Sequence, residues 1–181
     1  MSVMRWLVDG YNVIRRAPEL RSREQQSLEA GRHALCALLV EVARISHDTF
    51  TVVFDGAEAG GRGAGGAGVT VLFSSARESA DHVLAKMARE GGAVVSNDRE
   101  VRRAAERAGA VVVTTDQFLA RLDQSRSVTV GAGASEPESE KDEGDDPARG
   151  PRKGNPRRLS KKERATRRAL GRLGPGELPA R

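Results

Sequence analysis

The sequence has little of several features that define common protein classes. It contains one cysteine, Cys36, in 181 residues, which excludes an intramolecular disulfide and a cysteine-built zinc site. No apolar run approaches the roughly 18 residues of a membrane-spanning helix, and the N-terminus lacks the pattern of a signal peptide. Aromatic residues make up only 3%, which argues against the base-stacking platforms of RRM and OB folds. We therefore expect a cytoplasmic protein.

Apolar residues are also scarce, and the charges are unevenly distributed. Apolar residues make up 38% and charged residues 30%, so part of the chain is expected to lie outside a packed core. The net charge is +1 over residues 1–130, −5 over 131–150 and +9 over 151–181. This division predicts a folded domain over residues 1–125, a disordered acidic linker over 126–150 and a basic tail over 151–181.

Short β-rich apolar runs alternate with helical patterns over the first 125 or so residues. The runs are apolar mostly at consecutive positions, as in strands buried on both faces of a parallel sheet; they are Met4–Val8, Phe50–Phe54, Val69–Phe73, Ala93–Ser96 and Ala110–Val113. Apolar spacing predicts a long helix over Glu24–Ile45 with a capping box at Ser22. Further helices are expected over Ala80–Arg89, over Arg99–Ala108 and after Thr115. Repeated strand–helix–strand units predict an α/β sandwich with a mainly parallel central sheet.

Two further segments have a composition of their own. Ala57–Gly68 contains six glycines in twelve residues and only Arg62 to contact a substrate, so we expect a flexible loop that is neither helix nor strand. In the tail, a capping-box pattern at Ser160 predicts a short basic helix over Lys161–Leu173. A helix of that length is marginal alone in water. We therefore expect it to order only on a partner, and its charge indicates RNA or the ribosome.

Acidic residues follow the ends of several predicted strands. Asp9 and Asp55 come directly after strands, Asp98 follows the fourth strand, and Asp81 opens the helix after the third. One such residue is more often a turn or capping residue, but several at one sheet edge would repel each other unless a cation neutralised them. Hard oxygen ligands suit Mg²⁺ or Mn²⁺. Their natural use is phosphodiester cleavage by metal-activated water.

The segment that begins at Asp9 carries a second polar residue. Asp9 and Asn12 are one helical turn apart, and Gly10 between them permits a tight strand-to-helix turn. Asp9 can then ligate a metal while the Asn12 amide bonds a phosphate or a neighbouring carboxylate. The alternative is that the two residues only begin a helix.

Together these motifs resemble the NYN domain in its YacP-like subgroup, which has a PIN-like nuclease fold. The resembling segments are DGYN at Asp9–Asn12, VFDG at Val53–Gly56, ESAD at Glu78–Asp81 and SND at Ser96–Asp98, in the family's order between Met4 and Leu122. The resemblance implies a three-layer sandwich and a metal-dependent endoribonuclease. Its acidic site would map onto Asp9, Asp55, Asp81 and Asp98, with Asn12 as the polar partner and Glu78 as a further candidate. The stretch SKKERATRRAL from Ser160 resembles the basic C-terminal extension of some YacP-like proteins.

The leading interpretation is an endoribonuclease whose metals activate water for in-line attack on phosphorus, leaving a 5′-phosphate and a 3′-hydroxyl. A metal-independent route through the 2′-hydroxyl would need a His or Lys pair, and the sequence shows none. Two alternatives stay open: a non-catalytic RNA- or ribosome-binding protein, and a phosphohydrolase of small phosphate esters. The basic tail disfavours the second alternative, because a small substrate gives no use for its charge. Asp116 is interpreted as an N-cap and Cys36 as a buried residue of the long helix.

Overall fold

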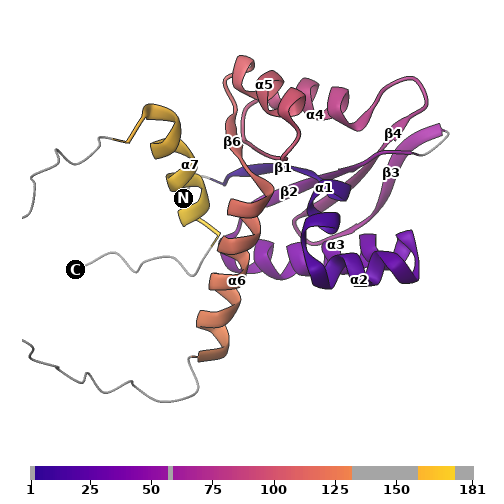
Figure 1. Cartoon of the computed structure of the whole chain (residues 1–181), viewed down its shortest axis with the longest axis horizontal. Helices are drawn as coiled ribbons and strands as arrows, with labels where there is room; N and C mark the ends of the chain where they lie inside the picture. The colour runs from indigo at the N-terminus through magenta and orange to yellow at the C-terminus, as the bar shows by residue number, and fades with distance from the viewer. Residues whose placement is uncertain (1–2, 57–58, 132–158, 174–181) are drawn as a thin grey trace, which may run out of the picture.

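A six-stranded sheet with the order β3-β4-β2-β1-β5-β6 forms the centre of the protein (Figure 1). The computed structural model describes residues 3–56, 59–131 and 159–173. The strands are β1 (Arg5–Asp9), β2 (Thr49–Phe54), β3 (Ala59–Gly66), β4 (Val69–Ser75), β5 (Ala93–Val95) and β6 (Val111–Val113). Neighbouring strands pair in parallel except β3 with β4. The five predicted strands and their mainly parallel sheet are confirmed.

Helices cover both faces of the sheet. They are α1 (Gly10–Arg16), α2 (Pro18–Gln26), α3 (Leu28–Ser46), α4 (Ala80–Ala88), α5 (Arg99–Arg107), α6 (Thr115–Gly131) and α7 (Lys161–Gly171). Alternate residues of β1 enter two separate cores: Trp6 and Val8 pack with α1, α3 and α6, and Leu7 packs with α4 and α5. Consecutive apolar residues in the central strands are thus explained by burial on both faces. The predicted three-layer α/β sandwich is confirmed.

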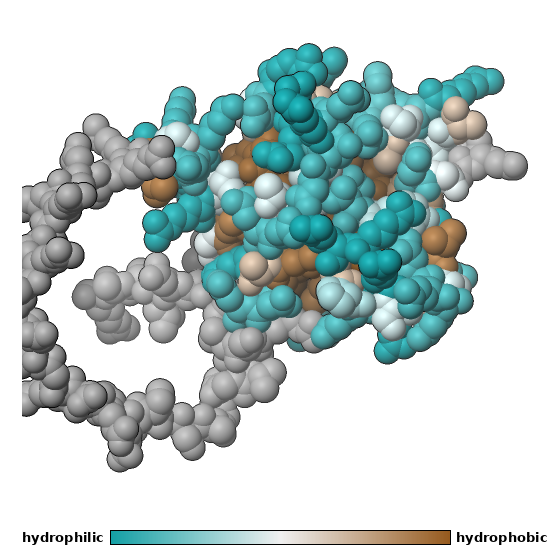
Figure 2. Space-filling view, in the orientation of Figure 1, coloured by the Kyte–Doolittle hydropathy of each residue, from teal (hydrophilic) through white to brown (hydrophobic). Residues whose placement is uncertain are grey.

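The surface is mostly polar. Hydrophilic side chains cover most of the face seen in Figure 2, and apolar side chains appear there as small patches. The large apolar side chains that the described residues expose include Val3 and Leu28. No helix in the described ranges has the length and apolar character needed to cross a membrane.

The helix predicted over Glu24–Ile45 is in fact two helices that meet at Ser27. Ser27 has an extended backbone, and its Oγ accepts a hydrogen bond from Ala30 N to cap α3. Ser22 lies inside α2, so the capping box expected there was wrong. A Cβ at Gly31 would lie only 2.9 Å from the Cβ of Glu24. The glycine therefore lets α2 and α3 pack closely.

The glycine-rich segment 57–68 was also assigned wrongly, because β3 occupies Ala59–Gly66. It pairs antiparallel with β4, with Arg62 opposite Leu72 and Gly63 opposite Val71. The backbone hydrogen bonds of this hairpin offset the low strand propensity of glycine. A Cβ at Gly63 would lie 2.7 Å from the Phe73 ring, so this glycine also leaves room for a side chain of the sheet.

The basic helix of the tail packs on the folded body. α7 begins with the predicted capping box at Ser160, and its Ala169, together with Leu173 just after the helix, joins the core beside α3 and α6. Thr166 Oγ1 donates a hydrogen bond to Val112 O of the edge strand β6 at 2.9 Å. The expectation that this helix orders only on a partner is therefore contradicted. Its apolar stripe is buried against its own chain.

The predicted acidic linker over residues 126–150 can be compared with the structure only at its start. α6 continues to Gly131, past the predicted start of the linker at residue 126. Residues 132–158, which include most of the predicted acidic linker, lie outside the described residues.

Candidate active site

Asp9 ends β1 at the centre of the sheet and caps α1. Its Oδ1 accepts a hydrogen bond from Asn12 N at 3.2 Å, and its Oδ2 accepts one from Ser96 Oγ at 3.0 Å. Gly10 follows, and a Cβ at this position would lie 2.3 Å from Cε1 of the Phe54 ring. Gly10 is absent from the residues with positive φ. The glycine is therefore needed for space, and not for the tight turn suggested by the sequence.

Asn12 connects three elements of the fold. Its Oδ1 accepts hydrogen bonds from Asn97 N at 3.1 Å and from Thr115 Oγ1 at 2.7 Å. Asn97 Oδ1 in turn accepts one from Thr115 N at 3.0 Å. These bonds tie α1 to the segment after β5 and to the start of α6. Asn12 Nδ2 makes no hydrogen bond with any residue in the described ranges, so it can donate to a ligand.

Asp98 lies three residues beyond the end of β5, the strand that pairs with β1, and it caps α5. Its Oδ1 accepts hydrogen bonds from Glu100 N at 2.7 Å and from Val101 N at 3.1 Å. Ser96 Oγ accepts a hydrogen bond from Asp98 N at 3.0 Å while it donates to Asp9. One buried hydroxyl therefore couples the positions of two predicted site residues.

Asp55 and Asp81 come from β2 and from α4. Asp55 directly follows β2, and its Oδ1 accepts a hydrogen bond from Ser74 Oγ at 2.6 Å. Asp81 lies in the first turn of α4, where Ser79 Oγ already caps the helix by accepting from His82 N. The Asp81 carboxylate is not used for capping, unlike those of Asp9 and Asp98, so it remains available for a ligand.

Burial and repulsion raise the pKa of two of these carboxyl groups. For Asp9, burial is the largest cause and the negative charge of Asp98 adds to it, while the hydrogen bonds that Asp9 accepts lower its pKa. For Asp81, burial again comes first, followed by the charges of Asp98, Asp9 and Asp55. Both shifts are in the direction expected for carboxylates crowded together without a neutralising cation.

All five predicted site residues line one cavity of about 780 Å³. They are Asp9, Asn12, Asp55, Asp81 and Asp98. The cavity lies at the carboxyl ends of β1, β2 and β5, where the strand order of the sheet reverses: β2 and β4 lie on one side of β1, and β5 and β6 lie on the other. Its lining also includes Tyr11, Arg15, Arg16 and Arg32, so cationic side chains share the cavity with the acids.

The side-chain groups of this cavity that could bind a metal ion are carboxylate and amide oxygens. Within the described part of the chain, no group of three or more His, Cys, Asp and Glu side chains is arranged to hold a metal ion. Mg²⁺ commonly keeps several waters and is bound through one or two carboxylates and the substrate phosphates. The carboxylates present fit that mode of binding.

Glu78 and the other candidates lie outside this cavity lining. Glu78 precedes α4, and its Oε1 lies 3.9 Å from Nε2 of His82 in that helix. Cys36 packs against the core on α3, and burial raises the pKa of its thiol. Cys36 was interpreted as buried, and the structure shows it half-buried.

Asp116 does not have its predicted role as an N-cap. Its Oδ1 accepts a hydrogen bond from Arg16 Nε at 2.6 Å, and its Oδ2 accepts one from Asn97 Nδ2 at 2.9 Å. Thr114 caps α6 instead, because its Oγ1 accepts a hydrogen bond from Gln117 N at 3.2 Å. Asp116 therefore fixes one side of the cavity through Arg16 and Asn97.

Sequence reasoning missed the residues that hold the acids in place. These supporting residues are Ser74, Ser96, Asn97 and Thr115, and three of them are buried polar residues. Buried hydroxyls are nearly always hydrogen-bonded, so a Ser or Thr at the end of a buried strand is a usable signal. The arginines were missed as well, although Arg15 lies four residues after Tyr11, a spacing that brings side chains together on a helix.

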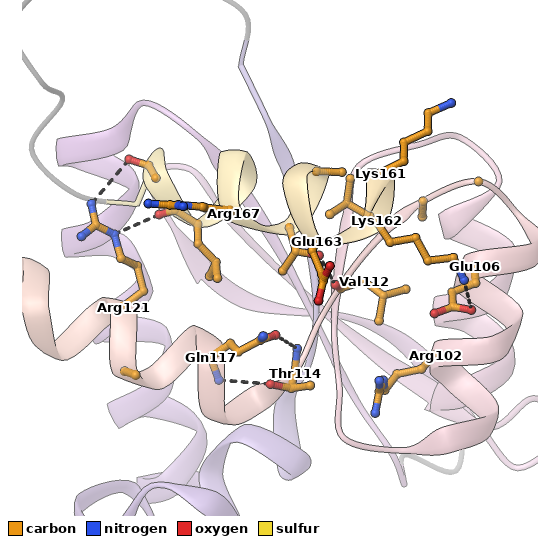
Figure 3. Close-up of a pocket in the computed structure, with 18 of the residues that line it drawn as sticks. Arg102, Glu106, Val112, Thr114, Gln117, Arg121, Lys161, Lys162, Glu163 and Arg167 are labelled. Atoms are coloured by element: carbon orange, nitrogen blue, oxygen red, sulfur yellow. Dashed lines mark hydrogen bonds and ion pairs between the residues drawn. The ribbon is translucent and has the colours of Figure 1, made fainter. Parts of the chain in front are cut away.

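A second cavity, of about 1240 Å³, lies beside the edge strand β6, between α5, α6 and α7 (Figure 3). Lys162 of α7 forms an ion pair with Glu106 of α5 at 2.8 Å. On the other side, Arg121 of α6 donates a hydrogen bond to Leu170 O at 3.0 Å. None of the predicted acids lines this cavity. This cavity is formed where α7 packs on the rest of the protein, and it is not the predicted acidic site.

Comparison with known proteins agrees with this arrangement. The family model of the YacP-like NYN domain matches residues 6–161. The chain belongs to the YacP-like NYN family. This family has a nuclease-type fold, and the match extends from β1 to the first residue of α7.

Two crystal structures of Rae1 (YacP) from Bacillus subtilis have a similar fold. One is 24% identical in sequence, covers 73% of this chain and 80% of that chain, and gives a TM-score of 0.60. The other, of a point mutant of the same protein, is 23% identical, covers 72% of this chain and 87% of that chain, and gives a TM-score of 0.58. No curated protein sequence matches the chain.

Proposed function

We propose that this protein is a metal-dependent endoribonuclease that cleaves RNA phosphodiester bonds with metal-activated water. The observation that carries the proposal is the convergence of four aspartates on one cavity at the carboxyl ends of parallel strands. Membership of a family with a nuclease-type fold supports the same reaction class.

Mg²⁺ or Mn²⁺ would be bound at Asp9, Asp81 and Asp98, with Asp55 as a further candidate ligand, and each ion would use one or two of these carboxylates together with waters and the substrate phosphates. The bound ion would lower the pKa of a water and stabilise charge on the attacking and leaving oxygens. The raised pKa values of Asp9 and Asp81 support this assignment, because a cation would relieve the repulsion that contributes to them.

The other residues of the cavity would bind and orient the substrate. The backbone of Asn12 and the hydroxyl of Ser96 fix the two oxygens of Asp9, so this carboxylate is oriented before a ligand arrives. The Asn12 side-chain amide has donors available for a phosphate oxygen. Arg15 and Arg32 line the same cavity and can offset the negative charge of a phosphodiester beside the acids.

The structure of α7 supports RNA as the partner and suggests how the tail contributes. Arg164, Arg167 and Arg168 are exposed on α7, and no ion pair among the described residues includes any of them. Because α7 is docked on the nuclease-type domain, these charges would form a fixed basic surface for RNA, either free or within the ribosome. Long-range attraction to RNA would come mainly from this surface and from the rest of the basic tail.

Cleavage of a mixed-sequence RNA tests the proposal. The full-length protein should cut the RNA internally in Mg²⁺ or Mn²⁺ and should not cut it in EDTA. The products should carry a 5′-phosphate and a 3′-hydroxyl, which makes them direct substrates for an RNA ligase. Products that end in a 2′,3′-cyclic phosphate, or equal cleavage in EDTA, would contradict the metal-dependent mechanism. Tight RNA binding without cleavage in either metal would favour the non-catalytic alternative.

A further inference from the structure

We infer that Arg32 is a phosphate-binding residue that receives the backbone of a polynucleotide at the wall of the acidic cavity. This inference rests on the proposed function, because it names how the same cavity would hold its substrate. It starts from the environment of the Arg32 guanidinium, which is unusual for an arginine on a helix surface.

The Arg32 guanidinium lies against three aromatic rings. Its central carbon is 5.4 Å from the ring centroid of Tyr11, 5.6 Å from that of Phe54 and 5.0 Å from that of Phe73. The rings also contact one another, since the centroids of Tyr11 and Phe54 are 5.2 Å apart. Arg32 is on α3, and its aromatic neighbours come from α1, β2 and β4. The cation is therefore held in place by three separate elements.

The hydrogen bonds of Arg32 fix its orientation and leave one edge available. Its Nε donates to the Tyr11 hydroxyl at 3.0 Å, and its Nη2 donates to the same oxygen. Nη1 has no hydrogen-bond partner among the residues that the structure describes. A guanidinium presents its N–H groups as planar pairs that match two oxygens of a phosphate. The edge formed by Nη1 and Nη2 can therefore accept such a ligand without further rearrangement.

Arg32 also has no acidic partner. None of the ion pairs formed within the described ranges includes it, whereas Arg16 is paired with Asp116 and Arg15 lies 3.6 Å from Glu24. Arg32 is only half-buried and lines the cavity, so an external anion can reach its guanidinium. Among the three arginines that line the cavity, Arg32 is thus the one prepared for an external anion.

The charges of the cavity decide where such an anion can bind. A phosphodiester is repelled by the four carboxylates, and Arg32 and Tyr11 line the same cavity from α3 and α1. A phosphate next to the scissile one can be held by Arg32 while the reacting phosphate lies near the acids. A contact of this kind is independent of base identity and of the 2′-hydroxyl.

RNA binding in EDTA tests the inference apart from cleavage. The probe is a fluorescent single strand of about 12 nucleotides, prepared as RNA and as DNA in two different base sequences. The proteins are the wild type, Arg32→Gln, Arg32→Lys and the matched control Arg44→Gln, which removes the same charge from an exposed position of α3. Melting temperatures check that each variant is folded.

Arg32→Gln should weaken binding about tenfold for all four probes, as expected for the loss of one charge-assisted contact. It should also reduce the slope of log affinity against log salt by about 0.7. Arg32→Lys should recover the slope but only part of the affinity, because it keeps the charge and loses the planar fork. Arg44→Gln should change neither value.

Three results would overturn the inference. These are wild-type affinity in Arg32→Gln, an equal loss in Arg44→Gln, or a loss that depends on base sequence, which would indicate base recognition instead. If Arg32→Gln melts before it can be tested, a wild-type salt slope together with a partial loss of affinity in Arg32→Lys would support the inference. The loss of both values in a folded Arg32→Lys would contradict it. If Arg32 controls binding but the wild type never cleaves RNA, the proposed function fails and the phosphate site stands.

Discussion

The guanidinium of Arg172, at the end of α7, forms an ion pair with the carboxylate of Asp48, with Nη2 2.9 Å from Oδ1. The Asp48 side chain is completely buried, and it also accepts hydrogen bonds from Met4 N and from Trp6 Nε1. A residue near the C-terminus therefore neutralises a buried charge beside the first strand. This contact makes α7 part of the folded domain.

Arg172→Ala should lower the free energy of unfolding by about 3 kcal/mol, because removing one partner leaves a buried charge unpaired. Urea unfolding of the full-length protein measures this loss. Arg168→Ala is the matched control, since Arg168 is exposed on the same helix, and it should change the stability by less than about 0.5 kcal/mol. Equal stability of the two variants would show that the Asp48 charge does not depend on α7.

The exposed face of α7 should control the salt dependence of RNA binding. Replacing Arg164, Arg167 and Arg168 together by Gln should weaken binding roughly tenfold or more and reduce the salt slope by about 2, from about 0.7 for each lost phosphate contact. The melting temperature should not change, because these side chains are exposed.

The control for this experiment is a triple Gln variant at Arg21, Arg23 and Arg44, which are exposed on α2 and α3. It removes the same charge from another surface. If the control loses as much affinity as the α7 variant, general attraction accounts for binding and α7 is not the docking surface. A deletion of the tail is a poor substitute, because it would also remove Arg172 and expose the core.

The contribution of Asp9 and Asp81 to the stability of the metal-free protein should fall as the pH rises above about 4. Their pKa values are higher in the folded protein than the ordinary value of 3.8, so the folded state binds protons more tightly than the unfolded state does. This contribution is fully present below the unfolded pKa and is lost as the pH passes through the raised values.

Urea unfolding in EDTA, at several values between about pH 4 and pH 7, measures this contribution. The difference in stability between the wild type and Asp9→Asn/Asp81→Asn should shift in favour of the double variant as the pH rises. A difference that does not change with pH would mean that the two carboxyl groups titrate normally.

Divalent metal should stabilise the folded domain. Saturating Mn²⁺ should raise the melting temperature of the wild type by about 5–10 °C, as binding at roughly a hundred times its dissociation constant predicts. Asp9→Asn/Asp98→Asn should show almost no shift, because it removes two proposed ligands. The same shift in both proteins would place the metal elsewhere.

Much of the site could be predicted from the sequence because strand ends are easy to recognise. Asp9, Asp55 and Asp98 follow apolar runs, and parallel strands bring their carboxyl ends to one edge. Asp81 was predicted on the same grounds and through the resemblance to the NYN family. The sequence did not predict the side chains that hold these carboxylates in place. An example is Ser96, whose hydroxyl donates a hydrogen bond to Asp9 and accepts one from the backbone N of Asp98.

β3 was not predicted because its glycines have low strand propensity, although it pairs with β4, the next strand in the chain. Two other features depend on partners that are distant in sequence. α7 is ordered by contacts of Ala169 and Leu173 with the core and by Asp48, which lies 124 positions away from Arg172. The environment of Arg32 depends on Phe54 and Phe73 from two strands. Local patterns cannot reveal such partners.

The rate of RNA cleavage by Asp9→Asn tests the central claim most directly. Asn keeps the capping function and most of the shape of Asp9, so the variant should fold as the wild type does. Its cleavage rate in saturating Mg²⁺ should fall by more than about a hundredfold, since even losing a group that only supports a metal ligand costs about 10- to 100-fold. Asp123→Asn, the same change at an exposed position of α6, should cleave at the wild-type rate. Wild-type cleavage by folded Asp9→Asn would contradict the assignment of this cavity as the active site.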